Sequence, residues 1–216
     1  MEKEKFVEAL KKAKESAKPR KFTQSFEISV ALKDVDLRKP EERISTYIVL
    51  PKGRGKDVKV CALVDKDMVT QAREVCDKVI TKDEFPEIDK KKVRVLCKEC
   101  DWFIAEATVM MHVAKHFGKF LAQKKKMPDP KAGAVFPPSA NLKGIVQRFK
   151  NLVKLEAKKQ PVINAPIGSE TQSIEDVADN AVAVYNQIVH SLPRGTQQIK
   201  AVYVKLTMGP AVRVEK

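Results

Sequence analysis

Two cysteines and two histidines near the middle of the chain have a spacing that could hold a metal ion. Cys97 and Cys100 form a Cys-x-x-Cys pair. His112 and His116 follow, and on a helix they would lie one turn apart on the same face. Two thiolates and two imidazoles complete the tetrahedral shell of a structural zinc ion. One hypothesis is therefore a zinc-dependent nucleic-acid-binding protein.

The residues between the two pairs argue against a zinc finger. Residues 101–107 read Asp-Trp-Phe-Ile-Ala-Glu-Ala, which is typical of a buried strand in a larger sheet. A zinc finger depends on its metal for folding, whereas a chain of 216 residues with 43% hydrophobic residues can bury a core without one. We therefore expect no metal and no other cofactor. Metal analysis of protein purified without a chelator distinguishes a zinc-dependent protein from one that folds without metal.

The other titratable residues do not form a catalytic set. A redox role for Cys97 and Cys100 would need a helix N-terminus directly after a strand, but a strand is predicted after Cys100. Glu84 and Glu87 lie among prolines and lysines without a nucleophile beside them. His190 falls in the last turn of a predicted helix, where a cation is favourable. The sequence therefore indicates a protein that is not an enzyme.

The charge balance points to a polyanionic partner. The chain has 42 Lys and Arg against 28 Asp and Glu, a formal net charge of +14. Neutralising phosphates with such cations releases counterions and favours binding to nucleic acid. The chain begins with a mixed-charge helix instead of a secretory signal, and no apolar run is long enough for a membrane span. Four cysteines are too few for a disulfide framework, so we expect a cytoplasmic protein with no membrane partner.

Strands of alternating polarity and amphipathic helices are predicted towards both ends of the chain. In residues 22–32, Phe22 shares the apolar face of a strand, whereas Ser25 and Glu27 lie on the polar face. Ser173, with an aspartate three residues later, predicts the start of a helix. The predicted elements are a helix at 3–18, strands at 22–32, 44–50 and 58–64, a strand at 161–168, a helix at 173–192 and a strand at 199–206.

Helices and strands alternate in the middle of the chain, starting at about residue 67. This order favours parallel strands joined by crossover helices. The predicted elements are a helix at 67–77, strands at 78–80, 93–96 and 102–105, a helix at 107–116, an irregular stretch at 123–138 and a helix at 141–156.

Several motifs resemble those of the L-one family of large-subunit ribosomal proteins. They occur in the same order along nearly the whole chain, and their sequences are closer to those of archaeal members. The final Thr207-Met208-Gly209-Pro210 is the most characteristic of them. The others are Lys21–Leu32, Tyr47–Pro51 with Gly53–Lys56, Phe103–Ala107, Met127-Pro128-x-Pro130 and Ile163-x-x-Pro166-Ile167-Gly168.

The resemblance implies an α/β fold in two domains. The first, an α+β RNA-binding domain, would be built from both chain ends, residues 1–66 and 158–216. The second, residues 67–157, would be an insertion with a Rossmann-like topology. The change of pattern near residue 67 points to the same division, although the residues alone do not show that the two ends meet.

The resemblance also implies a function. Family members bind large-subunit ribosomal RNA at the mobile stalk near the exit site and assist release of deacylated tRNA. Many also bind their own mRNA and repress its translation, and the free protein is expected to be a monomer. Carried over to this sequence, the RNA-binding residues are Lys21, Phe22, Ser25, Glu27, Lys205, Thr207, Met208 and Gly209.

Some of these residues have an alternative explanation, and two positions depart from the family pattern. Phe22 could belong to the core, and Gly209 could be only a turn glycine instead of a point where the backbone approaches a ribose. The run Ala122–Lys126 stands where relatives have Gly-Pro-Arg-Gly before the Met-Pro-x-Pro motif, so the role of the loop 122–131 is open. Leu206 replaces a residue that often carries a hydroxyl, which puts one RNA contact in doubt.

Overall fold

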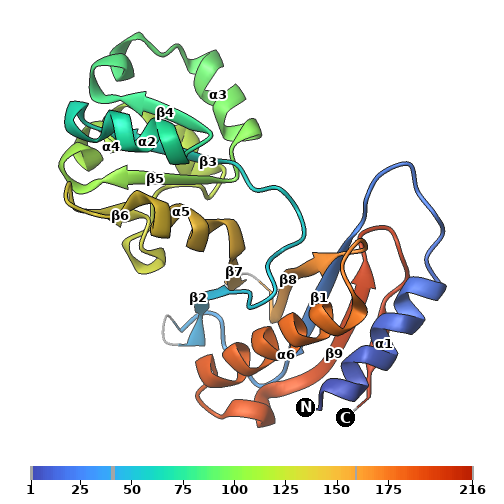
Figure 1. Cartoon of the computed structure of the whole chain (residues 1–216). Coiled ribbons are helices and arrows are strands. Elements are labelled where there is room, and N and C mark those ends of the chain that lie inside the picture. Colours follow the sequence, from blue (N-terminus) through green and yellow to red (C-terminus); the bar gives the residue numbers. More distant parts are fainter. Residues whose placement is uncertain (1, 40–41, 159, 216) are drawn as a thin grey trace. The chain divides into compact units, whose positions relative to one another are not determined.

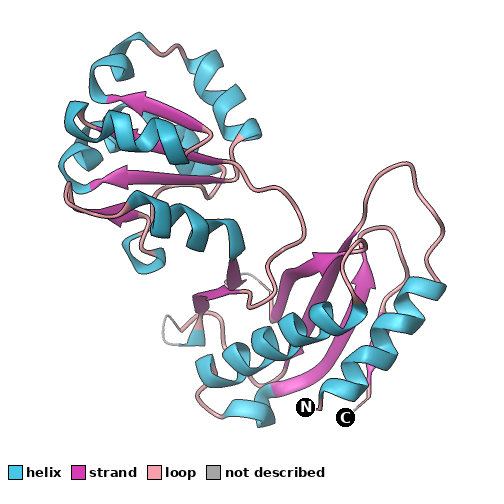
Figure 2. Cartoon of the chain, viewed as in Figure 1, coloured by secondary structure: helices cyan, strands magenta, loops and turns pink. Residues whose placement is uncertain are grey.

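The computed structural model describes residues 2–39, 42–158 and 160–215. The chain forms two units, each with its own sheet and helices (Figure 1, Figure 2). Unit 1 consists of residues 1–56 and 151–216, and unit 2 consists of residues 57–150. The strand at 58–64 therefore lies in unit 2, and residues 151–157 lie in unit 1, whereas the division expected from the sequence placed them the other way round.

Unit 1 is built from elements that are far apart in the sequence. Its elements are α1 (Lys3–Glu15), β1 (Ser25–Leu32), β2 (Ile44–Val49), β7 (Leu152–Ala157), β8 (Val162–Ser169), α6 (Ile174–Ser191), a 3-10 turn η6 (Gly195–Gln198), β9 (Ile199–Leu206) and β10 (Val212–Val214). A four-stranded antiparallel sheet has the order β10-β9-β1-β8, so that the first strand of the chain lies between two of the last.

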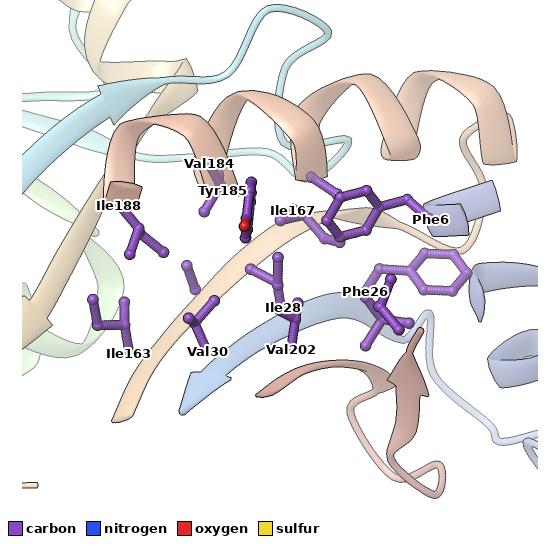
Figure 3. Packing of buried hydrophobic residues seen from close by; sticks show 14 of the residues in the cluster. Phe6, Phe26, Ile28, Val30, Ile163, Ile167, Val184, Tyr185, Ile188 and Val202 are labelled. Carbon is purple, nitrogen blue, oxygen red and sulfur yellow. The ribbon is translucent and has the colours of Figure 1, made fainter. Parts of the chain in front are cut away.

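The core of unit 1 fills the space between this sheet and the helices α1 and α6, which cover one of its faces (Figure 1). Alternate residues of β1, such as Phe26, Ile28 and Val30, point into the core because successive strand residues face opposite sides (Figure 3). Phe6 of α1 packs edge-on against Tyr185 of α6 with ring centroids 6.2 Å apart. Burying a side chain of this size contributes about 1.5–3 kcal/mol to stability.

A second, two-stranded sheet in unit 1 pairs β2 with β7 in antiparallel fashion. The helix predicted for 141–156 is wrong in its last turn, because α5 (Leu142–Asn151) ends where β7 begins. From Val153 to Ala157, buried and half-buried residues alternate, and pairing with β2 supplies the hydrogen bonds that a helix would otherwise make. The short edge strand β10 was not predicted.

Unit 2 has a parallel sheet in the order β4-β3-β5-β6. Its strands are β3 (Val60–Val64), β4 (Lys78–Thr81), β5 (Trp102–Glu106) and β6 (Val135–Phe136), and its helices are α2 (Val69–Val75), α3 (Lys90–Glu99), α4 (Met110–Gln123) and α5. Short 3-10 turns lie at η2 (Lys66–Met68), η3 (Lys82–Glu87), η4 (Ala107–Val109) and η5 (Pro130–Ala132). The parallel sheet with crossover helices confirms the predicted α/β fold class.

The strand predicted at 93–96 is wrong, since these residues belong to α3. Val93 and Cys97 are buried on one face of this helix and contribute to the core of unit 2. Two β-branched residues, Val93 and Val95, at alternate positions suggested a strand, but the spacing of four between Val93 and Cys97 is that of a helix. Tertiary burial therefore decides the conformation of this segment.

Candidate nucleic-acid interface

Hydrogen bonds from Thr207, the residue after β9, connect the end of β9 to the start of β1. The hydroxyl Oγ1 of Thr207 accepts a hydrogen bond from the amide of Ser25 (3.1 Å) and donates one to its carbonyl oxygen (3.3 Å). The amide of Thr207 also donates to that carbonyl (3.1 Å). Three contacts to one residue fix the position of Ser25, whose side chain lies on the half-buried face of β1. Ser25 and Thr207, which were both predicted for the site and lie 182 positions apart in the sequence, are thus neighbours.

Gln24 connects the same region to two further segments. Its side chain is only 3% exposed, and its Oε1 accepts a hydrogen bond from the amide of Met208 (3.1 Å). Its Nε2 donates to the carbonyl of Lys18 (3.5 Å), and its own carbonyl accepts from the amide of Glu170 (3.0 Å). Gln24 is not among the site residues predicted from the sequence. A polar amide in the apolar row of a strand was the signal that could have identified it.

The two large apolar side chains predicted for the site are exposed. Met208 is 58% exposed and Phe22 is 51% exposed. Phe22 lies before β1 instead of within it, so the alternative that places Phe22 in the core is wrong. Lys21 beside it is also exposed. Unit 1 therefore presents an apolar surface and a cation immediately before its central strand.

Gly209 closes a tight turn after β9. Its amide donates to the carbonyl of Leu206 (3.0 Å). A Cβ atom at this position would lie 3.3 Å from the Cβ atoms of both Ala17 and Leu206, which is tighter than ordinary van der Waals contact. A side chain at position 209 would thus crowd the segment that follows α1, in agreement with the turn-glycine interpretation. A close approach of this backbone to a ribose stays a prediction.

The face of the sheet opposite the core carries polar side chains in cross-strand rows. Lys205 of β9 lies directly across from Glu27 of β1, and both are half-buried. Ser29 is flanked by Asn164 of β8 and Tyr203 of β9. A lysine beside Glu27 offsets the repulsion between that carboxylate and a phosphate. Hydroxyl, amide and ammonium groups on this face suit hydrogen bonding to riboses and phosphates.

The four residues of the zinc hypothesis do not form a metal site. Within residues 2–39, 42–158 and 160–215, no group of three or more His, Cys, Asp or Glu could hold a metal ion. Cys100 instead forms a hydrogen bond with Cys61, which, together with burial, holds the pKa of the Cys61 thiol well above its ordinary value. Lys126 Nζ donates to the carbonyl oxygens of Cys97 (3.0 Å) and Cys100 (2.7 Å), and His112 is exposed on α4.

No helix among the described residues is long and apolar enough to cross a bilayer. Together, the features above define a basic, two-unit α/β protein whose candidate site is a polar sheet face next to an exposed methionine and phenylalanine. Its first unit is built from both ends of the chain.

Comparison with known proteins identifies the family. A sequence model described as the ribosomal protein L1p/L10e family matches residues 10–210. The large ribosomal subunit protein uL1 of Pyrococcus horikoshii is 46% identical over 217 residues, which cover 99% of this chain and 97% of that protein. The protein of the same name from Thermococcus kodakarensis is 44% identical over 218 residues, covering 100% of this chain and 99% of that one. The chain belongs to the ribosomal protein L1p/L10e family.

These findings confirm the resemblance seen in the sequence, including its archaeal character. A third archaeal relative, the uL1 protein of Nanoarchaeum equitans, is 43% identical over 212 residues. The relatives are ribosomal structural proteins, and their names indicate no enzymatic activity.

Proposed function

We propose that this protein is a structural constituent of the large ribosomal subunit in the cytoplasm and binds large-subunit ribosomal RNA at the mobile stalk near the exit site. The contact surface comprises Lys21, Phe22, Ser25, Glu27, Lys205, Thr207, Met208 and Gly209. From this position the protein assists release of deacylated tRNA. It also represses translation by binding its own mRNA, and it is a monomer when free of RNA.

The observation that carries the proposal is the hydrogen-bonded junction of β1 with the turn after β9. Thr207 and Gln24 hold the backbone at Ser25 and Met208 in place before any ligand arrives. A surface that is already ordered loses less conformational entropy on binding than a flexible loop would. Structured RNA is recognised largely through shape and 2′-hydroxyl contacts, which a rigid polar surface can provide. The excess of lysine and arginine supplies the attraction for phosphates.

The main test is binding of the purified protein to a fragment of the large-subunit stalk RNA, compared with an unrelated hairpin, over a salt series. We expect stalk binding to persist at salt concentrations where hairpin binding is lost. Specific nucleic-acid complexes typically gain ~4–10 kcal/mol over non-specific ones. Equal affinities that vanish together as salt rises would mean that only the net charge acts, and the proposed site would be rejected.

A matched pair of methionine variants locates the site. Met208→Ala is expected to weaken stalk RNA binding about tenfold, which corresponds to ~1.4 kcal/mol, because it removes an exposed apolar contact. Met111→Ala is the control, since Met111 is 84% exposed on α4 in unit 2. Equal affinities of the two variants would exclude Met208 from the interface.

A pair of Thr207 variants tests the junction itself. Thr207→Ala removes the hydroxyl that holds Ser25 and should weaken specific binding, whereas Thr207→Ser keeps the hydroxyl and should bind like the parent protein. Both variants are expected to remain folded, because the amide of Thr207 still donates to the carbonyl of Ser25. Equal binding by both variants would mean that the hydroxyl does not contribute.

The tRNA and mRNA roles need separate assays. Ribosomes reconstituted without the protein should release deacylated tRNA more slowly, and addition of the parent protein should restore the rate. Translation of the protein's own mRNA in a cell-free system should fall as the protein is added, and Met208→Ala should relieve this repression. Unchanged translation with the parent protein would remove the mRNA from the proposal while leaving the ribosomal role intact.

A further inference from the structure

Unit 2 has an apolar groove of about 600 Å³ between the strand β4 and the helix α3. All of the residues that line this groove belong to unit 2, whereas the residues proposed to contact RNA belong to unit 1. It is lined by Lys78, Val79, Ile80, Ile88, Lys91, Lys92, Val95, Leu96 and Glu99.

The helix α3 carries apolar residues on more than one side, and the core of unit 2 does not cover all of them. Val93 and Cys97 are buried in the core of unit 2. Val95 and Leu96 line the groove, together with Ile88 just before the helix. Leu96 and Ile88 are half-buried and also pack against the core, so Val95 is the most exposed apolar residue of the three. The Val95 side chain is 50% exposed, although burying it would be favourable. A row of apolar residues in a groove rimmed by polar ones is typical of an interaction site.

The groove follows the edge of the sheet. It touches the three consecutive residues Lys78, Val79 and Ile80 of β4. Because successive side chains of a strand point to opposite faces, a groove that contacts three in a row runs along the backbone of the strand. β4 is one of the two edge strands of the sheet in unit 2. Amide and carbonyl groups on the outer side of an edge strand can pair with an added strand.

The charges on the rim select the kind of occupant. Lys78 and Glu99, which both line the groove, form an ion pair, so their charges compensate each other. Lys91 and Lys92 remain, and both are exposed at the first turn of α3. The rim is therefore positive while the floor is apolar. A partner that complements both must carry carboxylates and apolar side chains together.

We propose that this groove binds an acidic, extended segment of a partner protein, which adds a strand to the edge of β4. Its apolar side chains pack against Ile88, Val95 and Leu96, and its carboxylates face Lys91 and Lys92. An RNA strand fits this groove less well, because a phosphodiester backbone has no amide groups for the strand edge and no aliphatic side chains for the floor.

The test uses a fluorescently labelled peptide in which valine alternates with glutamate, and a second peptide in which lysine replaces glutamate. Fluorescence anisotropy with the full-length protein should show binding of the acidic peptide only. Backbone amide signals of Lys78–Thr81 should shift in NMR spectra when this peptide is added. Binding of both peptides, or shifts elsewhere only, would overturn the proposal.

Two pairs of variants separate the apolar floor from the charged rim. Val95→Ser should weaken peptide binding about tenfold, as for a central apolar contact of an interface, whereas the control Val49→Ser in β2 should not. Val95 and Val49 are comparable because they are 50% and 41% exposed. Lys91→Glu with Lys92→Glu should weaken binding by a similar factor, whereas Lys115→Glu with Lys119→Glu on α4 should leave it unchanged. Circular dichroism confirms that each variant is folded.

A uridine oligonucleotide serves as a polyanion without apolar side chains. It should fail to displace the acidic peptide at equal concentration, and Val95→Ser should bind stalk RNA like the parent protein. Displacement of the peptide by the oligonucleotide, or equal peptide binding by Val95→Ser and Val49→Ser, would show that the groove is at most an electrostatic contact, and the proposal would fall.

Discussion

The contacts of Gln24 predict a contribution to both stability and RNA binding. We expect Gln24→Leu to lower the free energy of unfolding by ~1 kcal/mol, because the partly buried amide of Met208 would lose its acceptor. Urea denaturation measures this change. The same variant should bind stalk RNA more weakly, since the turn that carries Met208 would no longer be held. Gln123→Leu, on the exposed end of α4, is the control.

The Cys76 thiol of unit 2 is expected to react slowly. Burial raises the pKa of the Cys76 thiol to about 11. Its reactive thiolate should therefore be scarce at neutral pH, and alkylation by iodoacetamide, followed by mass spectrometry, should accelerate only as the pH approaches 11. The native thiol holds its proton more tightly than the unfolded one, so this contribution to stability is complete below pH 9 and is lost as the pH rises through about 11. Rapid alkylation of native protein at pH 7 would contradict this expectation.

At the scale of residues, the sequence alone identifies site residues that belong to a family motif. It does not identify site residues whose role depends on contacts made in the folded chain. Thr207 and Ser25 were recognised from the family pattern, and the structure places them in contact. The location of Phe22 outside the strand depends on where the pairing with β8 and β9 begins, at Ser25 and Phe26. The role of Gln24 depends on Lys18, Met208 and Glu170, which meet only in the folded chain.

At the scale of elements, local patterns identified most helices and strands but failed where tertiary pairing decides. α6 was predicted with its start at Ser173, because a capping residue acts within one turn. The apolar residues of 152–157 suit either a helix or a strand, and the sequence predicts the end of a helix here. Pairing with β2 makes this segment the strand β7. β10 is three residues long, and its pairing with β9 is the only feature that makes it a strand.

The cap of α6 can be tested directly. Ser173 Oγ accepts a hydrogen bond from the amide of Asp176 (3.1 Å) and donates to its carboxylate (2.7 Å). Ser173→Ala should lower the free energy of unfolding by ~1 kcal/mol, as is usual for the loss of a serine cap. Thermal and urea denaturation measure the difference. Ser139→Ala, at an exposed loop position, should change stability much less, and equal effects would show that the cap is not responsible.

At the scale of the molecule, unit 1 should fold without unit 2. The chain leaves and re-enters unit 1 at neighbouring points, because the amide of Leu50 donates to the carbonyl of Asn151 (3.0 Å). A short glycine-serine linker in place of residues 57–150 should therefore leave the core of unit 1 intact and stalk RNA binding within about threefold of the parent value, less than the tenfold that ~1.4 kcal/mol would produce. Calorimetry and RNA titration check both points. An unfolded product would show that unit 1 needs the insertion.

The strand order of unit 1 also determines when the molecule can acquire its fold during synthesis. β1 emerges early, but both of its neighbours, β8 and β9, lie beyond residue 160. The sheet of unit 2 needs only residues up to Phe136 and can form while β1 still has no partner. A ribosome that stalls before β9 therefore releases a fragment without the junction at Thr207. Every chain that carries the junction has been translated through β9, so the candidate RNA surface exists only after β1 has gained both of its neighbours.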